Sequence, residues 1–188
     1  MNKKIMIIVI IVLIIGVPIA VIAGNYNNLV TLDEEVNNSW AQVENQLKRR
    51  ADLIPNLVET VKGFAAQEED ILVGVTEARS RVVAADSPEE LANANQELTG
   101  ALQGLNVVVE RYPELKSNEN FMQLQDELAG TENRIAVARK DYNESARDLN
   151  GKIRRFPTNI VAGIFGIEQR EYFEVSEEDT EVPDVNFE

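Results

Sequence analysis

An uninterrupted apolar run near the start of the chain constrains the fold more than any other sequence feature. It begins with Ile5, ends with Ala23 and contains 19 residues without a charge. As a helix it would be about 28 Å long, close to the roughly 30 Å hydrocarbon thickness of a bilayer. The alternative is a cleaved signal peptide, but the apolar core of a signal peptide is typically about 7–15 residues long. We therefore expect residues 1–24 to form a short cytoplasmic N-terminus and a transmembrane anchor, with the lipid bilayer as a partner.

Basic residues lie on only one side of this run. Lys3 and Lys4 precede it, whereas residues 25–44 contain four acidic residues and no Lys or Arg. By the positive-inside rule, this asymmetry places the N-terminus in the cytoplasm and the rest of the chain on the extracytoplasmic side. The predicted localisation is the cell membrane, with a single pass.

The chain of 188 residues contains neither Cys nor His. Disulfides, zinc sites, Cys nucleophiles and His-based proton transfer are therefore excluded, and a di-metal centre built on Glu-x-x-His pairs is excluded as well. The formal net charge of −14 would be repelled by phosphate backbones. We accordingly expect no enzyme activity, no metal, no cofactor and no nucleic-acid partner.

Between residues 25 and 156 the apolar residues recur at steps of three and four, which is typical of amphipathic helices. Several rows have a strict sevenfold spacing, such as Leu91, Leu98 and Leu105. No stretch alternates with the period of two that indicates strands. The pattern predicts an all-α fold, in which the N-terminal transmembrane helix is followed by an up-and-down antiparallel four-helix bundle over residues 25–156.

Capping residues indicate where these helices begin and end. The basic run at residues 48–50 suggests the end of the first helix, and Asp52 with Pro55 suggests the start of the second, with the connection at Ala51. Ser87 followed by Pro88 and two glutamates is a capping box that predicts the start of the third helix. Pro113 should end that helix, and the fourth should open within residues 117–120.

Two segments follow the predicted bundle. Residues 157–173 are largely apolar, and because four antiparallel helices return the chain to its starting end, they should lie near the membrane. Ile160, Ile164 and Phe165 would then either lie at the membrane interface or fold back to close the base of the bundle. Residues 174–188 contain seven acids and no base, and we expect them to be a disordered acidic tail.

Two groups of charged residues are candidate sites. Glu68 interrupts an apolar row, and Arg134 is at a similar distance along the fourth helix. Either the two side chains pair, or the apolar stripe rotates at this point and Glu68 is solvated. Arg49, Arg50 and Asp52 lie at the turn farthest from the membrane, and they form either a contact for a partner protein or an ordinary pair of helix ends.

Several motifs of the chain form a recognisable family pattern. They lie in residues 26–58, including Trp40-Ala41-Gln42-Val43 and Asp52-Leu53-Ile54-Pro55-Asn56-Leu57-Val58, and in later segments such as Thr131-Glu132-Asn133-Arg134-Ile135 and Phe156-Pro157. In these motifs the chain closely resembles the LemA family of bacterial membrane-anchored proteins. The resemblance implies a single-pass membrane protein with a helical-bundle domain and no established enzymatic activity.

These observations favour a non-enzymatic, membrane-tethered scaffold or adaptor of the bacterial cell envelope, whose partner would be an unidentified membrane or envelope protein. The alternative is an extracytoplasmic sensor or ligand-binding module, whose helices repack when a peptide or lipid binds.

Overall fold

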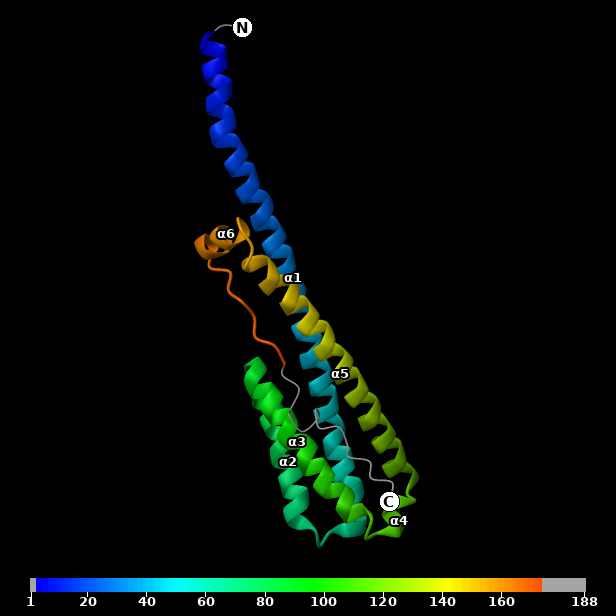
Figure 1. The fold of residues 1–188 in the computed structure, drawn as a ribbon. Coiled ribbons are helices and arrows are strands. Elements are labelled where there is room, and N and C mark those ends of the chain that lie inside the picture. Colours follow the sequence, from blue (N-terminus) through cyan, green and yellow to red (C-terminus); the bar gives the residue numbers. More distant parts are fainter. Residues whose placement is uncertain (1–2, 174–188) are drawn as a thin grey trace, which may run out of the picture. The chain divides into compact units, whose positions relative to one another are not determined.

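The structure, a computed structural model, describes residues 3–173, with side chains described from Val12 onward. Within this range the chain forms six helices and no strand, so the all-α prediction is confirmed. The predicted acidic tail at residues 174–188 lies outside the described range. The helices shown in Figure 1 are α1 (Lys3–Ala65), α2 (Glu69–Ala84), α3 (Pro88–Val109), α4 (Pro113–Lys116), α5 (Glu119–Ile153) and α6 (Thr158–Phe165).

The chain divides into two compact units. Unit 1 comprises Met1–Val36 and Asn143–Glu188, and unit 2 comprises Asn37–Tyr142. Helices α1 and α5 therefore contribute residues to both units.

The core of unit 2 contains the predicted sevenfold row Leu91, Leu98 and Leu105 of α3, and all three side chains are buried. The other helical segments of the unit also contribute buried apolar side chains. Helices α2 and α3 lie side by side, and both bury one apolar stripe (Figure 1). The other buried apolar residues of this core include Val43, Leu47, Ile54, Leu57, Val61, Leu72, Val75, Val82, Phe121, Leu128 and Ile135.

The predicted connection at Ala51 is wrong, because α1 continues without a break to Ala65. This one helix of 63 residues combines the predicted anchor, the predicted first helix and the first part of the predicted second helix. The break occurs instead between Ala65 and Glu69, where the backbone turns and Glu68 precedes α2. Basic residues followed by Asp and Pro are typical of a helix boundary, but here buried side chains on both sides of Ala51 keep the helix continuous.

The predicted start of α3 is confirmed. Ser87 is the N-cap, and its hydroxyl oxygen accepts a hydrogen bond from the backbone N–H of Glu90 at 3.2 Å. The Glu90 carboxylate in turn accepts from the N–H of Asp86 at 3.1 Å. This reciprocal pair satisfies backbone donors that a helix N-terminus leaves free.

Between α3 and α5 the chain makes a short turn. Helix α3 ends at Val109, four residues before the predicted end at Pro113, and Pro113 instead begins the four-residue helix α4. Asn118 then caps α5, since its side-chain oxygen accepts from the N–H of Phe121 at 3.0 Å. The start of α5 at Glu119 lies within the predicted residues 117–120.

Unit 1 contains α6, which forms in the middle of the predicted apolar segment at residues 157–173. Gly166 ends this helix with φ +67°, a left-handed conformation that favours glycine, and the N–H of Ile167 donates to the carbonyl of Ala162 at 3.0 Å. The core of the unit contains Leu29, Val36, Ala146, Leu149, Val161 and Ala162.

Candidate functional site

Helix α6 contacts α1 at the point where the apolar part of α1 ends. The hydroxyl of Thr158 donates a hydrogen bond to the side-chain oxygen of Asn25 at 2.7 Å. One residue further along α1, the rings of Tyr26 and Phe165 pack with centroids 4.4 Å apart. Asn25 is the first polar side chain after the apolar run, so these contacts fix α6 beside the end of the predicted anchor.

The two faces of α6 differ in burial, but both are largely apolar. Val161 and Ala162 are buried within unit 1. Ile160 and Ile164 point away from this core and are 53% and 65% exposed. A surface helix normally places polar residues on its exposed face, whereas Asn159 is the one polar residue among the exposed residues of α6.

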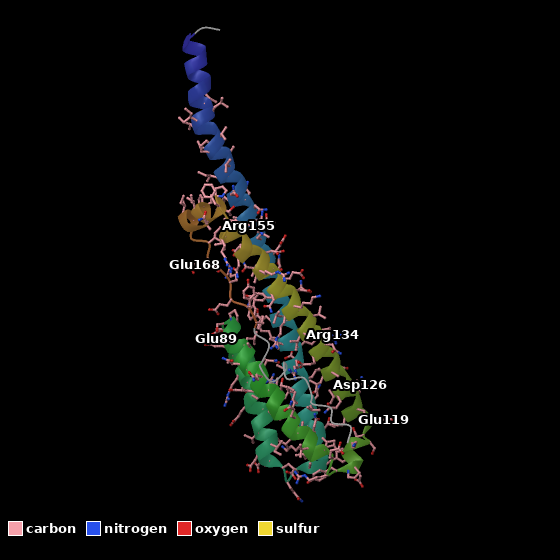
Figure 2. The ribbon with its side chains drawn as sticks, viewed as in Figure 1. Glu89, Glu119, Asp126, Arg134, Arg155 and Glu168 are labelled. Atoms are coloured by element: carbon pink, nitrogen blue, oxygen red, sulfur yellow. The ribbon has the colours of Figure 1, made fainter. Side chains whose placement is uncertain are left out.

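Charged residues flank α6 without lying on it. Arg154 and Arg155 precede the helix and Glu168 follows it, and Figure 2 shows Arg155 and Glu168 beside the two ends of α6. Arg154 and Glu168 also line an open depression of about 620 Å³ next to this helix. The apolar helix therefore has a charged border.

Two asparagines of α5 hold the segment that follows α6. Asn150 donates to the carbonyl of Arg170 and accepts from its N–H, both at 2.8 Å. Asn143 bonds Phe173 in the same way, at 2.9 and 2.8 Å. The guanidinium of Arg170 adds an ion pair with Asp33 of α1 at 2.9 Å. Each asparagine side chain thus bonds both the backbone N–H and the backbone carbonyl of one residue, Arg170 or Phe173. These bonds hold the chain after α6 along α5.

In unit 2 the most unusual residue is Arg50, a buried arginine. One nitrogen of its guanidinium, Nη1, donates to the side-chain oxygens of Asn95 at 2.8 Å and Thr99 at 3.1 Å, both on α3. The same nitrogen pairs with the Glu132 carboxylate of α5 at 2.8 Å. Burial lowers the pKa of the Arg50 guanidinium, while Glu132 acts in the opposite direction. Arg50 therefore joins three helices through one charge, at a cost in desolvation.

A second arginine explains how α1 accommodates a proline. Pro55 has no N–H, so the carbonyl of Ala51 loses its normal partner four residues along the helix. The Nε of Arg79 on α2 donates to this carbonyl at 3.0 Å. The freed backbone acceptor is thus satisfied by a side chain from the neighbouring helix, and α1 can pass through Pro55.

The candidate residues from the sequence fall in different places. Glu68 pairs with Arg111 at 3.0 Å and accepts from the hydroxyl of Tyr112 at 3.2 Å, so it joins the start of α2 to the turn between α3 and α4. Arg134, the partner that the sequence suggested, lies exposed on α5, where its guanidinium is beside Gly130 (Figure 2). Glu68 therefore has a partner, but a different arginine.

The turn that would have carried a partner contact at residues 49–52 does not form. Arg49 and Asp52 are exposed on the surface of the continuous helix α1, whereas Arg50 is in the core. The structure thus separates this trio, and the buried role belongs to Arg50 alone.

Comparison with known proteins assigns the family. The model of the LemA family matches residues 39–187. The chain belongs to the LemA family. Among its relatives, Magnetosome protein MamQ 2 of Paramagnetospirillum magneticum is 29% identical over 182 residues, which are 83% of this chain and 67% of that protein. Protein LemA of Metamycoplasma hominis is 29% identical over 179 residues, which are 93% and 80% of the two chains.

Several residues that organise this LemA-family chain were not predicted as site residues from its sequence. Asn143 and Asn150 are seven residues apart, a spacing that places both on one face of a helix, and that was the available signal. Asn95 occupies a core position between Ala94 and Leu98, where a polar residue needs a partner. No sequence pattern relates Arg79 to the carbonyl of Ala51, because the contact depends on how α2 packs on α1.

Across the described side chains, no group of three or more acidic residues is placed to hold a metal ion. The names of the two relatives designate no enzymatic activity. The arrangement offers ion pairs, amide clamps and an apolar surface, which are the means of binding and positioning.

Proposed function

We propose that this protein is a single-pass, membrane-tethered helical scaffold of the bacterial cell envelope, without enzymatic activity. The observation that carries the proposal is the continuity of α1, which runs from an exposed apolar segment into a helix with a buried core stripe. Over the described residues, α1 is the one helix long and apolar enough to cross a membrane. Its described apolar side chains before Asn25, from Val12 onward, are exposed, as they would be against lipid.

The body that α1 presents is, in this proposal, an up-and-down four-helix bundle formed by the helical segments of unit 2. Support comes from side-chain contacts between the segments. Arg50 of α1 contacts α3 and α5, and Arg79 joins α2 to α1. On the surface, Arg81 of α2 pairs with Glu97 of α3. The short turns at residues 66–68, 85–87 and 110–118 favour antiparallel neighbours.

The anchor is tested by membrane fractionation. The full chain should remain in the membrane fraction after washing with high salt and with alkaline carbonate. A variant lacking residues 3–24 should become soluble while keeping its helical circular dichroism. Release of the full chain by salt would contradict a transmembrane tether.

The scaffold role is tested by site-specific photo-crosslinking in living cells. A photoreactive residue is placed in turn at exposed apolar positions of unit 2, for which Val83, Val107 and Val137 are suitable. A scaffold should crosslink to the same envelope protein from one or two of these positions and not from the others. A chain that crosslinks to no protein from any position, while remaining in the membrane, would contradict the adaptor role.

The relatives are consistent with this role. One of them is named a magnetosome protein, and this name refers to a structure of the cell and not to a catalysed reaction. The orientation, with the N-terminus in the cytoplasm and the helical body outside, follows from Lys3 and Lys4 and remains part of the proposal.

A further inference from the structure

The exposed face of α6 carries two large apolar side chains, and a third lies in the turn before the helix. Ile160 and Ile164 are four residues apart on α6 and are 53% and 65% exposed, and residues at this spacing lie on one face of a helix. Phe156, in the turn that precedes α6, is 81% exposed. Large exposed apolar side chains grouped in one short segment mark an interaction site rather than an ordinary surface.

The position of this surface points to its occupant. Within unit 1, α6 is held against Asn25 and Tyr26, the first residues of α1 after its apolar segment. If that segment crosses the bilayer, α6 is at the depth where hydrocarbon gives way to headgroups. Tyr26 is also at the level where tyrosines are enriched in membrane proteins.

The charges around α6 fit the same occupant. The helix itself carries no charge over Thr158–Phe165. Arg154 and Arg155 lie in the turn before it and are exposed, so they can reach anionic phosphate groups. Glu168 follows the other end of the helix, so the arginine end is the one that complements the surface of an anionic membrane.

We propose that Phe156 and α6 form an in-plane element that lies in the bilayer interface and orients unit 1 on the membrane. The opposite face of α6, with Val161 and Ala162, is buried in unit 1, and the contacts with Asn25 and Tyr26 attach this element to α1. The helix is too short to span the membrane, so it can only lie along it. This proposal rests on the membrane tether proposed above.

The test uses a single tryptophan as a depth reporter in the full chain, reconstituted into vesicles. Trp40→Phe removes the native indole, and Ile164→Trp places a new one on the exposed face of α6. The vesicles contain phosphatidylcholine with phosphatidylglycerol, and their lipids are brominated either near the headgroup or near the end of the acyl chain. An interfacial helix buries its apolar face about 5–10 Å below the headgroups. The shallow bromines should therefore quench the emission strongly and the deep bromines weakly.

Tyr172→Trp in the same Trp40→Phe background is the matched control. Tyr172 is a half-exposed aromatic residue of unit 1, next to Phe173, which Asn143 holds ten residues before the end of α5. Its emission should be unaffected by brominated lipid. Phe165→Trp is a second reporter on the same helix and should also be quenched, which guards against a local disturbance by the first substitution. Circular dichroism checks that each variant is folded.

Two results would overturn the inference. Emission from Ile164→Trp that is typical of water and unquenched would mean that α6 faces solvent. Emission that is blue-shifted yet unquenched would mean that protein covers the face, either the base of the bundle or a second copy. Flotation with the vesicles separates these results from a failure of the tether, because a chain that floats is still anchored.

The arginines are tested in the same assay. Quenching of Ile164→Trp should be stronger in vesicles with phosphatidylglycerol than in phosphatidylcholine alone, and Arg154→Gln with Arg155→Gln should abolish this difference. An unchanged difference in the double variant would show that other groups attract the anionic lipid.

Discussion

Arg50 is a charged side chain that contacts residues of α3 and α5 from α1. Its net contribution to the free energy of unfolding can be measured. Its guanidinium stays protonated at any ordinary pH, so the desolvation that lowers its pKa appears as a loss of stability. The bonds to Asn95, Thr99 and Glu132 offset that loss. We therefore expect Arg50 to contribute more to which helices pack together than to how strongly they do so.

Truncation of Arg50 should be costly because it leaves Asn95 buried without its partner. We expect Arg50→Ala to lower the free energy of unfolding by about 2–4 kcal/mol. Arg50→Met fills the same space without a charge to desolvate and should cost less than the alanine variant. Urea unfolding of the detergent-solubilised protein gives the values. Arg49→Ala is the control and should change stability by no more than about 0.5 kcal/mol, since Arg49 is exposed. An equal loss for Arg49→Ala and Arg50→Ala would contradict the buried role of Arg50.

Arg79 and Pro55 should be coupled through the carbonyl of Ala51. With Pro55 in place, Arg79→Ala leaves this buried acceptor unsatisfied and should cost about 1–3 kcal/mol. In a Pro55→Ala background, the new N–H of residue 55 can bond the carbonyl within the helix, so the same change should cost much less. A double-mutant cycle measured by urea unfolding gives the coupling free energy. Purely additive effects would show that Arg79 does not compensate for the proline.

At the scale of elements, α1 and α3 show what local sequence can and cannot predict. The capping box at Ser87 predicted the start of α3 correctly, because all its partners lie within four residues. The signals at Asp52 and Pro55 were equally local and predicted a break that is absent. The decisive partner of that region, Arg79, comes from another helix, so only the tertiary packing shows that the helix can continue.

The segment after α6 is held by side chains rather than by secondary structure, and one substitution should release it. Asn150→Ala removes the amide that satisfies both backbone groups of Arg170. Hydrogen exchange at the Arg170 amide should accelerate strongly, and exchange at the Phe173 amide should accelerate less, because Asn143 still holds it. Asn159→Ala, a change of an exposed asparagine on α6, is the control and should leave both amides protected. Unchanged protection of Arg170 in the Asn150 variant would contradict the clamp.

At the scale of the whole molecule, periodicity was sufficient for the fold class and insufficient for the candidate sites. The sevenfold row of Leu91, Leu98 and Leu105 identified buried residues of α3, because burial follows directly from helix geometry. Pairs between helices, such as Glu68 with Arg111, depend on where each helix turns. When the break is placed at Ala51 instead of after Ala65, the distance of each second-helix residue from the turn is overestimated. For this reason Arg134 was inferred as the partner of Glu68.

The orientation of the chain can be tested with cysteine labelling, because the native chain contains no cysteine. The positive-inside rule applied to Lys3 and Lys4 predicts that unit 2 is outside the cytoplasmic membrane. Val137 is exposed on α5, so Val137→Cys should react with a membrane-impermeant maleimide when it is added to intact cells whose outer layers admit it. A cysteine placed at Asn2, before the span, should react only after the membrane is permeabilised. Both variants should label equally in detergent, which controls for the intrinsic reactivity of each site. The reverse pattern would place the helical body in the cytoplasm, and the scaffold would then have to organise cytoplasmic rather than envelope partners.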